Sequence, residues 1–363
     1  MPDTVRKRAE LWLRHLLRQM LTGNVKPELV EHATSVMPTG RPLRMLLLRQ
    51  DRIGDVLVSE PFIRTLRAAY PSAVIDVVLS PNNLAARHAI AASINDVLLY
   101  RKGLLDVVRL VRLMRQRPYD VMVDLMDNPS TTSTLLLRLS GIPIRIGIDK
   151  SNRQVYTHVV PLPDRSSVHI VERLANLLLP FGIDPQAVAL DLQYPYTQQD
   201  AHRAQHGLGS DPRPTLAVNV TGTDHARRYG TTQWAEAIRL IRERHPDWRV
   251  VLLSAPSDAG VLRQLASKTE ADLVEPSSSF HDFAVTVLQC QALVTADTSI
   301  VHVAAAHKVP QVVMYVHANK ALMPWYPYAS PHVALCASSQ VAEIPATIVA
   351  DAVDTLFLRI ATT

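Results

Sequence analysis

The chain has 363 residues, of which 47% are hydrophobic, so it is long enough for two ordinary α/β domains, each with its own buried sheet. Its formal net charge of +5 suits acidic partners such as nucleotides, phosphorylated glycolipids or anionic membrane surfaces. Aromatic residues make up only 5% of the chain, and basic runs interleaved with aromatics and zinc-finger spacings are missing, so the sequence does not argue for nucleic-acid binding.

The cysteines and the N-terminus point to the cytoplasm. Cys290 and Cys336 lie far apart in apolar stretches without a CxxC pattern, and both are predicted to be buried thiols in a reducing compartment. The N-terminus lacks the apolar core and cleavage site of a signal peptide. No window holds the roughly 20 apolar residues that span a bilayer, so we expect a cytoplasmic protein.

Residues 1–42 are predicted to form an amphipathic helix and a linker. Apolar residues recur at helical spacing from about Asp3 to Leu21, Gly23 follows as a stop signal, and basic residues cover the polar face. Such a helix can make a peripheral contact with the inner face of the cytoplasmic membrane. The alternative is a helix that packs on the body of the protein with a solvated face.

Residues 43–195 alternate short apolar strands with helices, which is typical of βαβ units and a parallel sheet. The predicted elements are strands over residues 45–48, 74–79 and 121–124 and helices over residues 55–70 and 104–116. The stretch 149–196 is richer in proline and polar residues, and we expect it to hold the last elements of this domain and a linker.

Residues 196–363 restart the same pattern. The predicted elements are strands over residues 215–220, 249–253, 292–295 and 311–315 and helices over residues 232–244, 257–267, 280–290 and 299–306. Two doubly wound α/β halves of similar size predict a central cleft in which the carboxyl ends of both sheets face one ligand.

The first polar cluster is the loop RQDRIGD, residues 49–55, between the first predicted strand and helix of the N-terminal half. Gly54 permits a tight turn or the close approach of a ligand. Asp55 falls in the first helical turn, where its carboxylate can take a proton from a hydroxyl or, alternatively, cap the helix. The loop has neither a GxGxxG nor a Walker A sequence, which disfavours an NAD-dependent dehydrogenase and a P-loop kinase.

The second cluster is TGTDHARRY, residues 221–229, which follows a predicted strand of the C-terminal half. A strand that ends in Thr and Gly before two arginines can supply hydroxyl, backbone and guanidinium donors to a diphosphate. Arg227 and Arg228 can also be interpreted as a solvated surface pair.

The third cluster, Asp297 to His302, follows an apolar strand and opens an alanine-rich helix. Free N–H groups at a helix start can bind an anion. Ser299 and His302 are three residues apart, so they share one face of the helix near its first turn. The alternative for His302 is a packed histidine without a ligand.

The order LLRQDRIGD, GTDHARRYGTTQW and VTADTSIVHVAAAHKVP resembles glycosyltransferase family 9, the ADP-heptose:lipopolysaccharide heptosyltransferase family, over roughly residues 43–320. The resemblance implies the GT-B fold, in which two Rossmann-like domains face a central cleft and bind the acceptor and the nucleotide sugar respectively. It also implies a metal-independent, inverting transferase that needs no cofactor. Its donor would be a nucleotide diphosphate sugar, with ADP-heptose favoured, and its acceptor a lipopolysaccharide core or another cell-surface glycan.

By the same resemblance, Asp55 would be the catalytic base, in a loop with Arg52 and Gly54. The implied donor-binding residues are Thr223, Arg227, Asp258, Asp297, Thr298, Ser299 and His302. Among these, Arg227 would contact the phosphates and Asp258 the nucleoside ribose.

The sequence also departs from the family pattern. Tyr229 and Gly230 stand where Trp-Pro is usual, Ser299 replaces a glycine, and residues 314–319 lack the G-P-T-D segment. The donor sugar can therefore differ from heptose. Two other functions remain open, a GT-B sugar-nucleotide epimerase and a non-catalytic nucleotide-sugar-binding protein.

Overall fold

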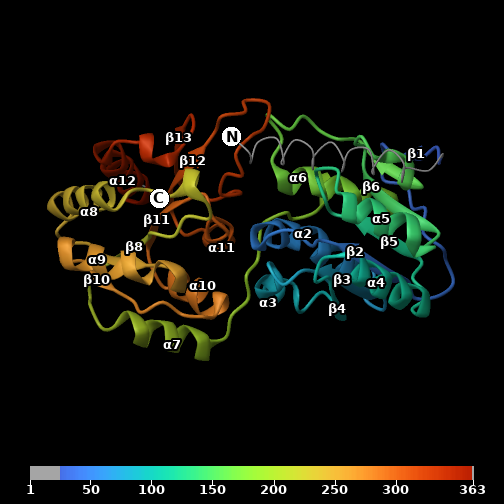
Figure 1. The fold of residues 1–363 in the computed structure, drawn as a ribbon, viewed down its shortest axis with the longest axis horizontal. Coiled ribbons are helices and arrows are strands. Elements are labelled where there is room, and N and C mark those ends of the chain that lie inside the picture. Colours follow the sequence, from blue (N-terminus) through green and yellow to red (C-terminus); the bar gives the residue numbers. More distant parts are fainter. Residues whose placement is uncertain (1–24, 362–363) are drawn as a thin grey trace. The chain divides into compact units, whose positions relative to one another are not determined.

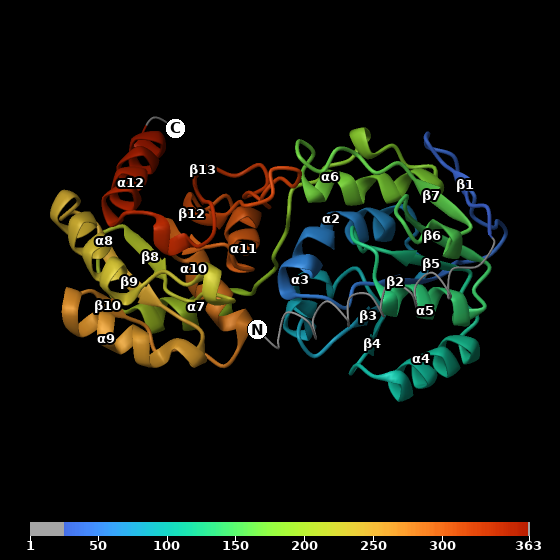
Figure 2. The same ribbon diagram turned by 45° about the horizontal axis from the view of Figure 1, so that its top comes forward.

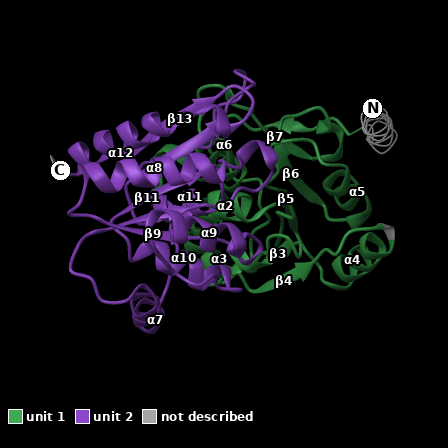
Figure 3. Cartoon of the chain, turned by 60° about the vertical axis from the view of Figure 1, so that its left-hand side comes forward, with its two compact units in different colours: residues 1–190 green, residues 191–363 purple. Residues whose placement is uncertain are grey.

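The computed structural model describes residues 25–361, and the chain divides into two units, Met1–Leu190 and Asp191–Thr363 (Figures 1 and 3). Each unit is built on one parallel β-sheet with helices, which confirms the predicted α/β class with two Rossmann-like doubly wound units. The division falls at the end of the proline-rich stretch that we expected to contain the linker.

Unit 1 contains a seven-stranded sheet in the order β1-β7-β6-β5-β2-β3-β4 (Figure 1). Its strands are β1 (Glu28–Leu29), β2 (Arg44–Leu48), β3 (Val74–Leu79), β4 (Asp96–Leu99), β5 (Val121–Asp124), β6 (Ile144–Ile148) and β7 (His158–Val160). Its α-helices are α2 (Ile53–Ala69), α3 (Arg87–Ile90), α4 (Leu104–Gln116), α5 (Thr131–Ser140) and α6 (Ile170–Ala175). Its 3₁₀ helices are η1 (Leu84–Ala86), η2 (Arg153–Val155), η3 (Asn176–Phe181) and η4 (Pro185–Ala187).

Helices cover both faces of this sheet, with α2, α3 and α6 on one side and α4 and α5 on the other (Figure 2). Strands that are covered on both faces have to be apolar along their whole length. The central strand β2 fits this rule, because Met45, Leu46, Leu47 and Leu48 are all fully buried. A continuous apolar run, such as residues 45–48, is therefore the sequence pattern of a central strand.

The segment before residue 43, which we expected to be a linker, adds a strand to the sheet. Glu28 and Leu29 form β1, which pairs in parallel with His158 and Val159 of β7 at the sheet edge. A strand of two residues is too short to show a periodic pattern in the sequence. It forms because the neighbouring strand offers it hydrogen-bond partners.

Unit 2 contains a six-stranded parallel sheet in the order β10-β9-β8-β11-β12-β13. Its strands are β8 (Thr215–Asn219), β9 (Arg249–Leu253), β10 (Asp272–Leu273), β11 (Ala292–Ala296), β12 (Gln311–Val316) and β13 (His332–Ala337). Its α-helices are α7 (Gln198–Leu208), α8 (Thr231–Arg244), α9 (Ala259–Thr269), α10 (Phe280–Leu288), α11 (Ile300–Ala306) and α12 (Ala346–Ala361). Its 3₁₀ helices are η5 (His225–Arg227), η6 (Pro256–Asp258) and η7 (Val341–Glu343).

Both sheets share one topology. Apart from the additional edge strand β1, the first three strands of each unit run outward in one direction and the next three run outward in the other. This creates a switch point between β2 and β5 in unit 1 and between β8 and β11 in unit 2. In open α/β sheets, ligands bind outside the carboxyl ends of the strands at such a point. A ligand is therefore expected at the loops after these four strands.

One prediction about the cysteines is wrong. Cys290 is buried as expected, and burial raises the pKa of its thiol to about 12. Cys336 is exposed, because it lies on β13, the edge strand of the unit 2 sheet. In the sequence alone, an apolar stretch on an edge strand has the same pattern as a buried core strand.

Two predictions concerned membranes. The amphipathic helix expected over residues 3–21 lies outside the described residues. Within residues 25–361, none of the helices combines the length and the apolar character that crossing a bilayer requires.

Candidate functional site

In unit 1 the predicted base Asp55 lies in the first turn of α2, next to the switch point. Its Oδ2 accepts a hydrogen bond from the backbone N–H of Arg52 at 2.9 Å, so Asp55 does cap the helix. Its Oδ1 lies 3.5 Å from Nη2 of Arg49, and 14% of the side chain is exposed. The cap therefore occupies one carboxylate oxygen and leaves the side chain partly accessible.

Arg49 fixes the loop that carries Asp55. Its side chain is only 2% exposed, although the residue is charged. Nε donates to the carbonyl oxygen of Asp55 at 2.7 Å, and Nη1 donates to the carbonyl oxygen of Leu125 after β5 at 2.5 Å. The guanidinium thus joins the two loops at the switch point. Sequence reasoning did not single out Arg49, and the available signal was a charged residue directly after a fully apolar strand.

A second carboxylate lies in the same loop. Asp51 is exposed overall, yet protein packed around its carboxyl group and the nearby Asp55 carboxylate raise the pKa of Asp51 to about 6. Arg49 and Arg52 lower the pKa of Asp51, but they do not outweigh these effects. The loop therefore holds two neighbouring acidic groups, and the charge of Asp55 is one cause of the raised pKa of Asp51.

Of the other two loop residues, Gly54 is placed differently from the expectation and Arg52 is not. Gly54 lies inside the first turn of α2 and is not among the glycines with positive φ, so it does not form the tight turn that we predicted. The close approach of a ligand at Gly54 stays a prediction. Arg52 precedes the helix, and it is exposed.

Buried ion pairs support the loop after β5. Asp124 is fully buried and accepts hydrogen bonds from Lys150 Nζ at 2.9 Å and from the Tyr156 hydroxyl at 2.7 Å. Burial and the Asp124 charge raise the pKa of Tyr156 well above its usual range. Asp127 pairs with Arg173 at 3.0 Å. These charges are compensated inside unit 1, so they form a rigid support for the loop that Arg49 contacts.

In unit 2, the loop after β8 is folded tightly on itself. A Cβ on the buried Gly222 would lie 2.5 Å from the carbonyl oxygen of Arg227, so only glycine fits there. Asp224 Oδ1 accepts a hydrogen bond from the Arg227 N–H at 3.1 Å. The loop is anchored by Tyr229, which is buried against Trp234 and donates its hydroxyl to the carbonyl oxygen of Ile344 at 2.9 Å. Tyr229 is therefore part of the core, and its packing holds Arg227 in place.

Arg227 joins the loops after β8 and β11. Its Nε donates to Asp297 Oδ2 at 2.9 Å, and its Nη1 donates to Asp224 Oδ2 at 2.6 Å. Burial acts to lower the pKa of Arg227, but the two carboxylates outweigh it and raise that pKa, so the guanidinium stays protonated. With 29% of the side chain exposed, Arg227 is a fixed cation at the switch point. Its neighbour Arg228 is 60% exposed, as expected of a solvated residue.

The structure brings Asp297, Thr298 and Ser299 to the same point, directly after β11. The hydroxyl of Thr298 is buried and has no hydrogen-bond partner among the described atoms. Ser299 precedes α11, a helix of only seven residues, which limits the dipole at its start. His302 is 4% exposed and its ring lies 6.1 Å from that of Trp325, so its surroundings are those of a packed histidine.

The other two predicted donor contacts follow β9 and β8. Asp258 ends η6 after β9, is 7% exposed, and lies 3.6 Å from Nη2 of Arg228. Thr223 is exposed in the loop after β8. Since β8, β9 and β11 are neighbouring parallel strands, all seven predicted donor residues lie near one edge of the unit 2 sheet.

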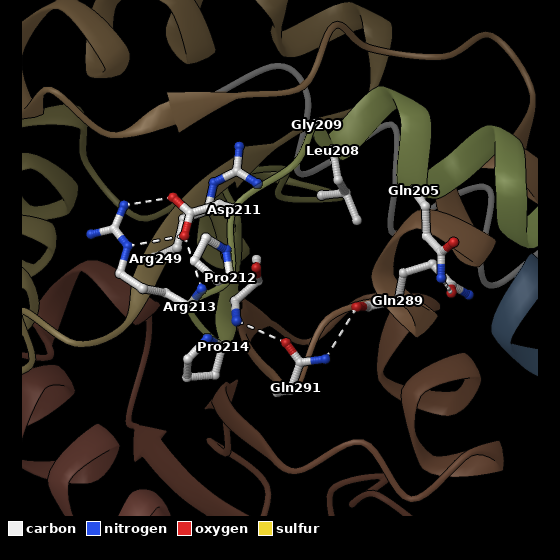
Figure 4. A pocket seen from close by; sticks show the side chains of 11 residues that line it. Gln205, Leu208, Gly209, Asp211, Pro212, Arg213, Pro214, Arg249, Gln289 and Gln291 are labelled. Atoms are coloured by element: carbon white, nitrogen blue, oxygen red, sulfur yellow. Dashed lines mark hydrogen bonds and ion pairs between the residues drawn. The ribbon is translucent and has the colours of Figure 1, made fainter.

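A surface pocket of unit 2 lies at the opposite edge, near the amino ends of β8, β9 and β11 (Figure 4). Its arginines are already paired, Arg213 with Asp211 at 2.7 Å and Arg249 with Asp272 at 2.5 Å. The pocket therefore contains none of the predicted site residues and offers no unpaired arginine.

The two units present different chemistry at their switch points. Unit 1 presents a partly exposed carboxylate, which can accept a proton. Unit 2 presents a guanidinium and a buried hydroxyl without a partner, which can bind an anion such as a diphosphate. Among residues 25–361 there is no group of three or more His, Cys, Asp or Glu side chains placed to hold a metal ion.

The comparisons with known proteins agree on one family. Residues 107–346 match the model of glycosyltransferase family 9 (heptosyltransferase). Lipopolysaccharide heptosyltransferase 3 of Escherichia coli is 22% identical over 279 residues, which are 72% of this chain and 80% of that protein.

Two solved structures show the same fold. The family 9 glycosyl transferase from Veillonella parvula aligns with a TM-score of 0.74 at 17% identity, over 89% of this chain and 99% of that one. The E. coli ADP-heptose lipopolysaccharide heptosyltransferase II aligns with a TM-score of 0.68 at 21% identity, over 87% of this chain and 99% of that one. The likeness to these enzymes supports the GT-B fold that the motifs implied.

Proposed function

Because the chain belongs to glycosyltransferase family 9, it is a glycosyltransferase, and we propose that it transfers heptose or a related sugar from a nucleotide diphosphate donor to a lipopolysaccharide core or another cell-surface glycan. In this proposal the reaction inverts the anomeric carbon and needs no metal. ADP-heptose is the favoured donor, because one similar structure is an ADP-heptose heptosyltransferase. The reaction would take place in the cytoplasm, at the inner face of the membrane where a glycolipid acceptor would lie.

The observation that carries the proposal is the position of Arg227. It is a permanent cation, held by two loops at a switch point and still partly exposed. A diphosphate that leaves the sugar gains negative charge, which a guanidinium held in advance stabilises without reorganisation. The unsatisfied Thr298 hydroxyl, with Thr223 and Ser299 nearby, would complete the phosphate contacts. Asp258 would bind the ribose, and Asp297 would hold Arg227 in position.

Asp55 is the proposed general base. It removes the proton from the acceptor hydroxyl as that oxygen attacks the anomeric carbon, and the bond between this carbon and the diphosphate oxygen breaks. The nucleoside diphosphate leaves from the opposite face, which inverts the configuration. General-base assistance typically contributes about 10²–10⁴-fold to the rate. Arg49 supports this role by holding both the backbone and the carboxylate of Asp55.

A donor screen followed by a transfer assay tests the proposal. Since a ligand that binds only the folded protein raises its melting temperature, ADP-, GDP-, UDP- and dTDP-linked sugars can be compared by thermal shift. The same nucleotide sugars incubated without an acceptor test for an epimerase, which would release the epimer or free nucleotide.

The decisive variant is Asp55→Asn, which preserves the size of the side chain. We expect transfer to fall by about 10²–10⁴-fold while the thermal shift caused by the donor stays the same. Glu172→Gln, on α6 of unit 1, is the control and should keep wild-type activity. Transfer by Asp55→Asn at the wild-type rate would refute the assignment of the base.

A further inference from the structure

The outward face of α4 combines exposed apolar and basic side chains. Leu105 is 89% exposed, more than any other large apolar residue in the described part of the chain, and Val108 is 60% exposed. Arg112 and Arg115 are exposed as well and follow one and two turns further along. At spacings of three and four residues, these four side chains lie along one face of the helix.

This face is not needed for the fold of unit 1. The opposite side of α4 supplies Val107, Leu110, Val111 and Met114 to the core, and all four are buried. A helix whose outer face was only solvated would carry polar residues where Leu105 and Val108 stand.

The apolar character continues onto the neighbouring helix. Leu139 of α5 is 37% exposed and lines a shallow groove together with Val108, Arg112 and Arg115. α4 and α5 lie side by side at the margin of unit 1 (Figure 2). The α4 face, defined by Leu105, Val108, Arg112, Arg115 and Leu139, is therefore continuous across two helices.

The positive charge of the α4 face favours an anionic partner. Arg112 makes no ion pair with any residue from 25 to 361, and Lys102 before the helix is also exposed. Asp106, on the neighbouring side of the helix, is already paired with Arg109 at 2.6 Å. A second copy of this face, or the basic residues 1–24 of the chain, would bring positive charge against positive charge. An anionic lipid surface accepts both the apolar and the basic side chains.

We propose that the α4 face docks the protein on an anionic phospholipid bilayer, with Leu105 and Val108 inserted at the headgroup level and Arg112 and Arg115 on the lipid phosphates.

The fold places one end of the α4 face at the same sheet edge as the loop that carries Asp55. α4 follows β4, so its first turn, with Leu105, lies at the carboxyl edge of the parallel sheet. The loop with Asp55 follows β2 at the same edge. Insertion of Leu105 would place the end of α4 at this edge against the headgroups. The benefit for a lipid-linked acceptor rests on the proposed function, whereas the docking itself does not.

Vesicle sedimentation of the full chain tests the proposal. Wild-type protein should bind vesicles of equal parts phosphatidylcholine and phosphatidylglycerol, and it should not bind pure phosphatidylcholine. We expect the double variant Leu105→Ser with Val108→Ser to lower the partition coefficient by about tenfold, and Arg112→Gln with Arg115→Gln to lower it by a similar factor at low salt.

Leu358→Ser is the matched control, because Leu358 is 70% exposed but lies on α12 with Asp351 and Asp354. It should bind like the wild type. Binding of both α4 variants at the wild-type level would overturn the proposal, and so would loss of binding only in Arg14→Gln with Arg18→Gln. Because the assay contains no sugar donor, its result does not depend on the proposed transfer reaction.

Discussion

The loop after β2 in unit 1 and the loop after β8 in unit 2 lie at the same place in sheets that share one strand order apart from the edge strand β1. In each loop an arginine reaches across the switch point. Arg49 reaches the Leu125 carbonyl group, and Arg227 reaches the Asp297 carboxylate. The two differ in exposure, since 2% of the Arg49 side chain is accessible but 29% of the Arg227 side chain.

This difference changes the role of the arginine in each loop. In unit 1 the arginine is inside and a carboxylate, Asp55, is accessible; in unit 2 the carboxylates Asp224 and Asp297 hold an arginine that is itself accessible. A buried guanidinium can serve only groups of its own protein, whereas a partly exposed one can also bind a ligand. One scaffold can thus offer a base in one unit and an anion site in the other.

The largest effect is expected when Arg49 is replaced. Arg49→Met leaves the Leu125 and Asp55 carbonyl groups without their donor, so the free energy of unfolding should fall by about 3 kcal/mol. Chemical denaturation measures this loss. Donor affinity should stay near the wild-type value, because Arg49 is buried in unit 1. A stable variant with weakened donor binding would contradict the assignment of Arg49 as an internal support.

Arg227→Ala should show the opposite pattern. The loss of charge-assisted contacts to a diphosphate should weaken donor binding by about tenfold to a hundredfold. Calorimetric titration with the nucleoside diphosphate measures the change. Arg228→Ala is the control on the adjacent, more exposed arginine and should have a smaller effect. Unchanged affinity in Arg227→Ala would place the diphosphate elsewhere.

A smaller change is expected from Asp224→Asn. The Asp224 carboxylate occupies Nη1 of Arg227 and repels a diphosphate, whereas asparagine retains the cap on the Arg227 N–H. Donor affinity should rise by about twofold to fivefold, since Asp224 is well exposed. Weaker binding in the same titration would mean that the Asp224 carboxylate itself is needed to hold Arg227.

The smallest effect concerns pH and stability. The pKa of Asp51 is raised from 3.8 to about 6, so the folded protein binds more protons than the unfolded chain between these values. Stability contributed by this group therefore falls as the pH rises from about 4 to about 6. Asp51→Asn should remove that slope in thermal melts across this range and should be more stable than the wild type above it. An unchanged slope would assign the titration to another group.

The sequence predicted the central parts of both units well. The bounds predicted for β3, α4, β5 and β9 are the observed ones, because long apolar runs and amphipathic helices carry their own periodicity. The edge strands β1, β4, β10 and β13 were not predicted, and neither were the inner strands β6 and β7 or the helices α3, α5, α6, α7 and α12. A short edge strand forms only because a neighbouring strand offers it a partner.

For the candidate site, the sequence by itself determined which residues gather at the switch points, because a polar loop directly after an apolar strand of a parallel sheet has to lie at its carboxyl edge. This holds for Asp55 and for Arg227 and Asp297 alike. Only the tertiary structure decided which side chain is accessible. Arg49 and Arg227 are the same residue type, and what separates them is their exposure and their partners from distant parts of the chain, which are the Leu125 carbonyl oxygen for Arg49 and the Asp297 carboxylate for Arg227.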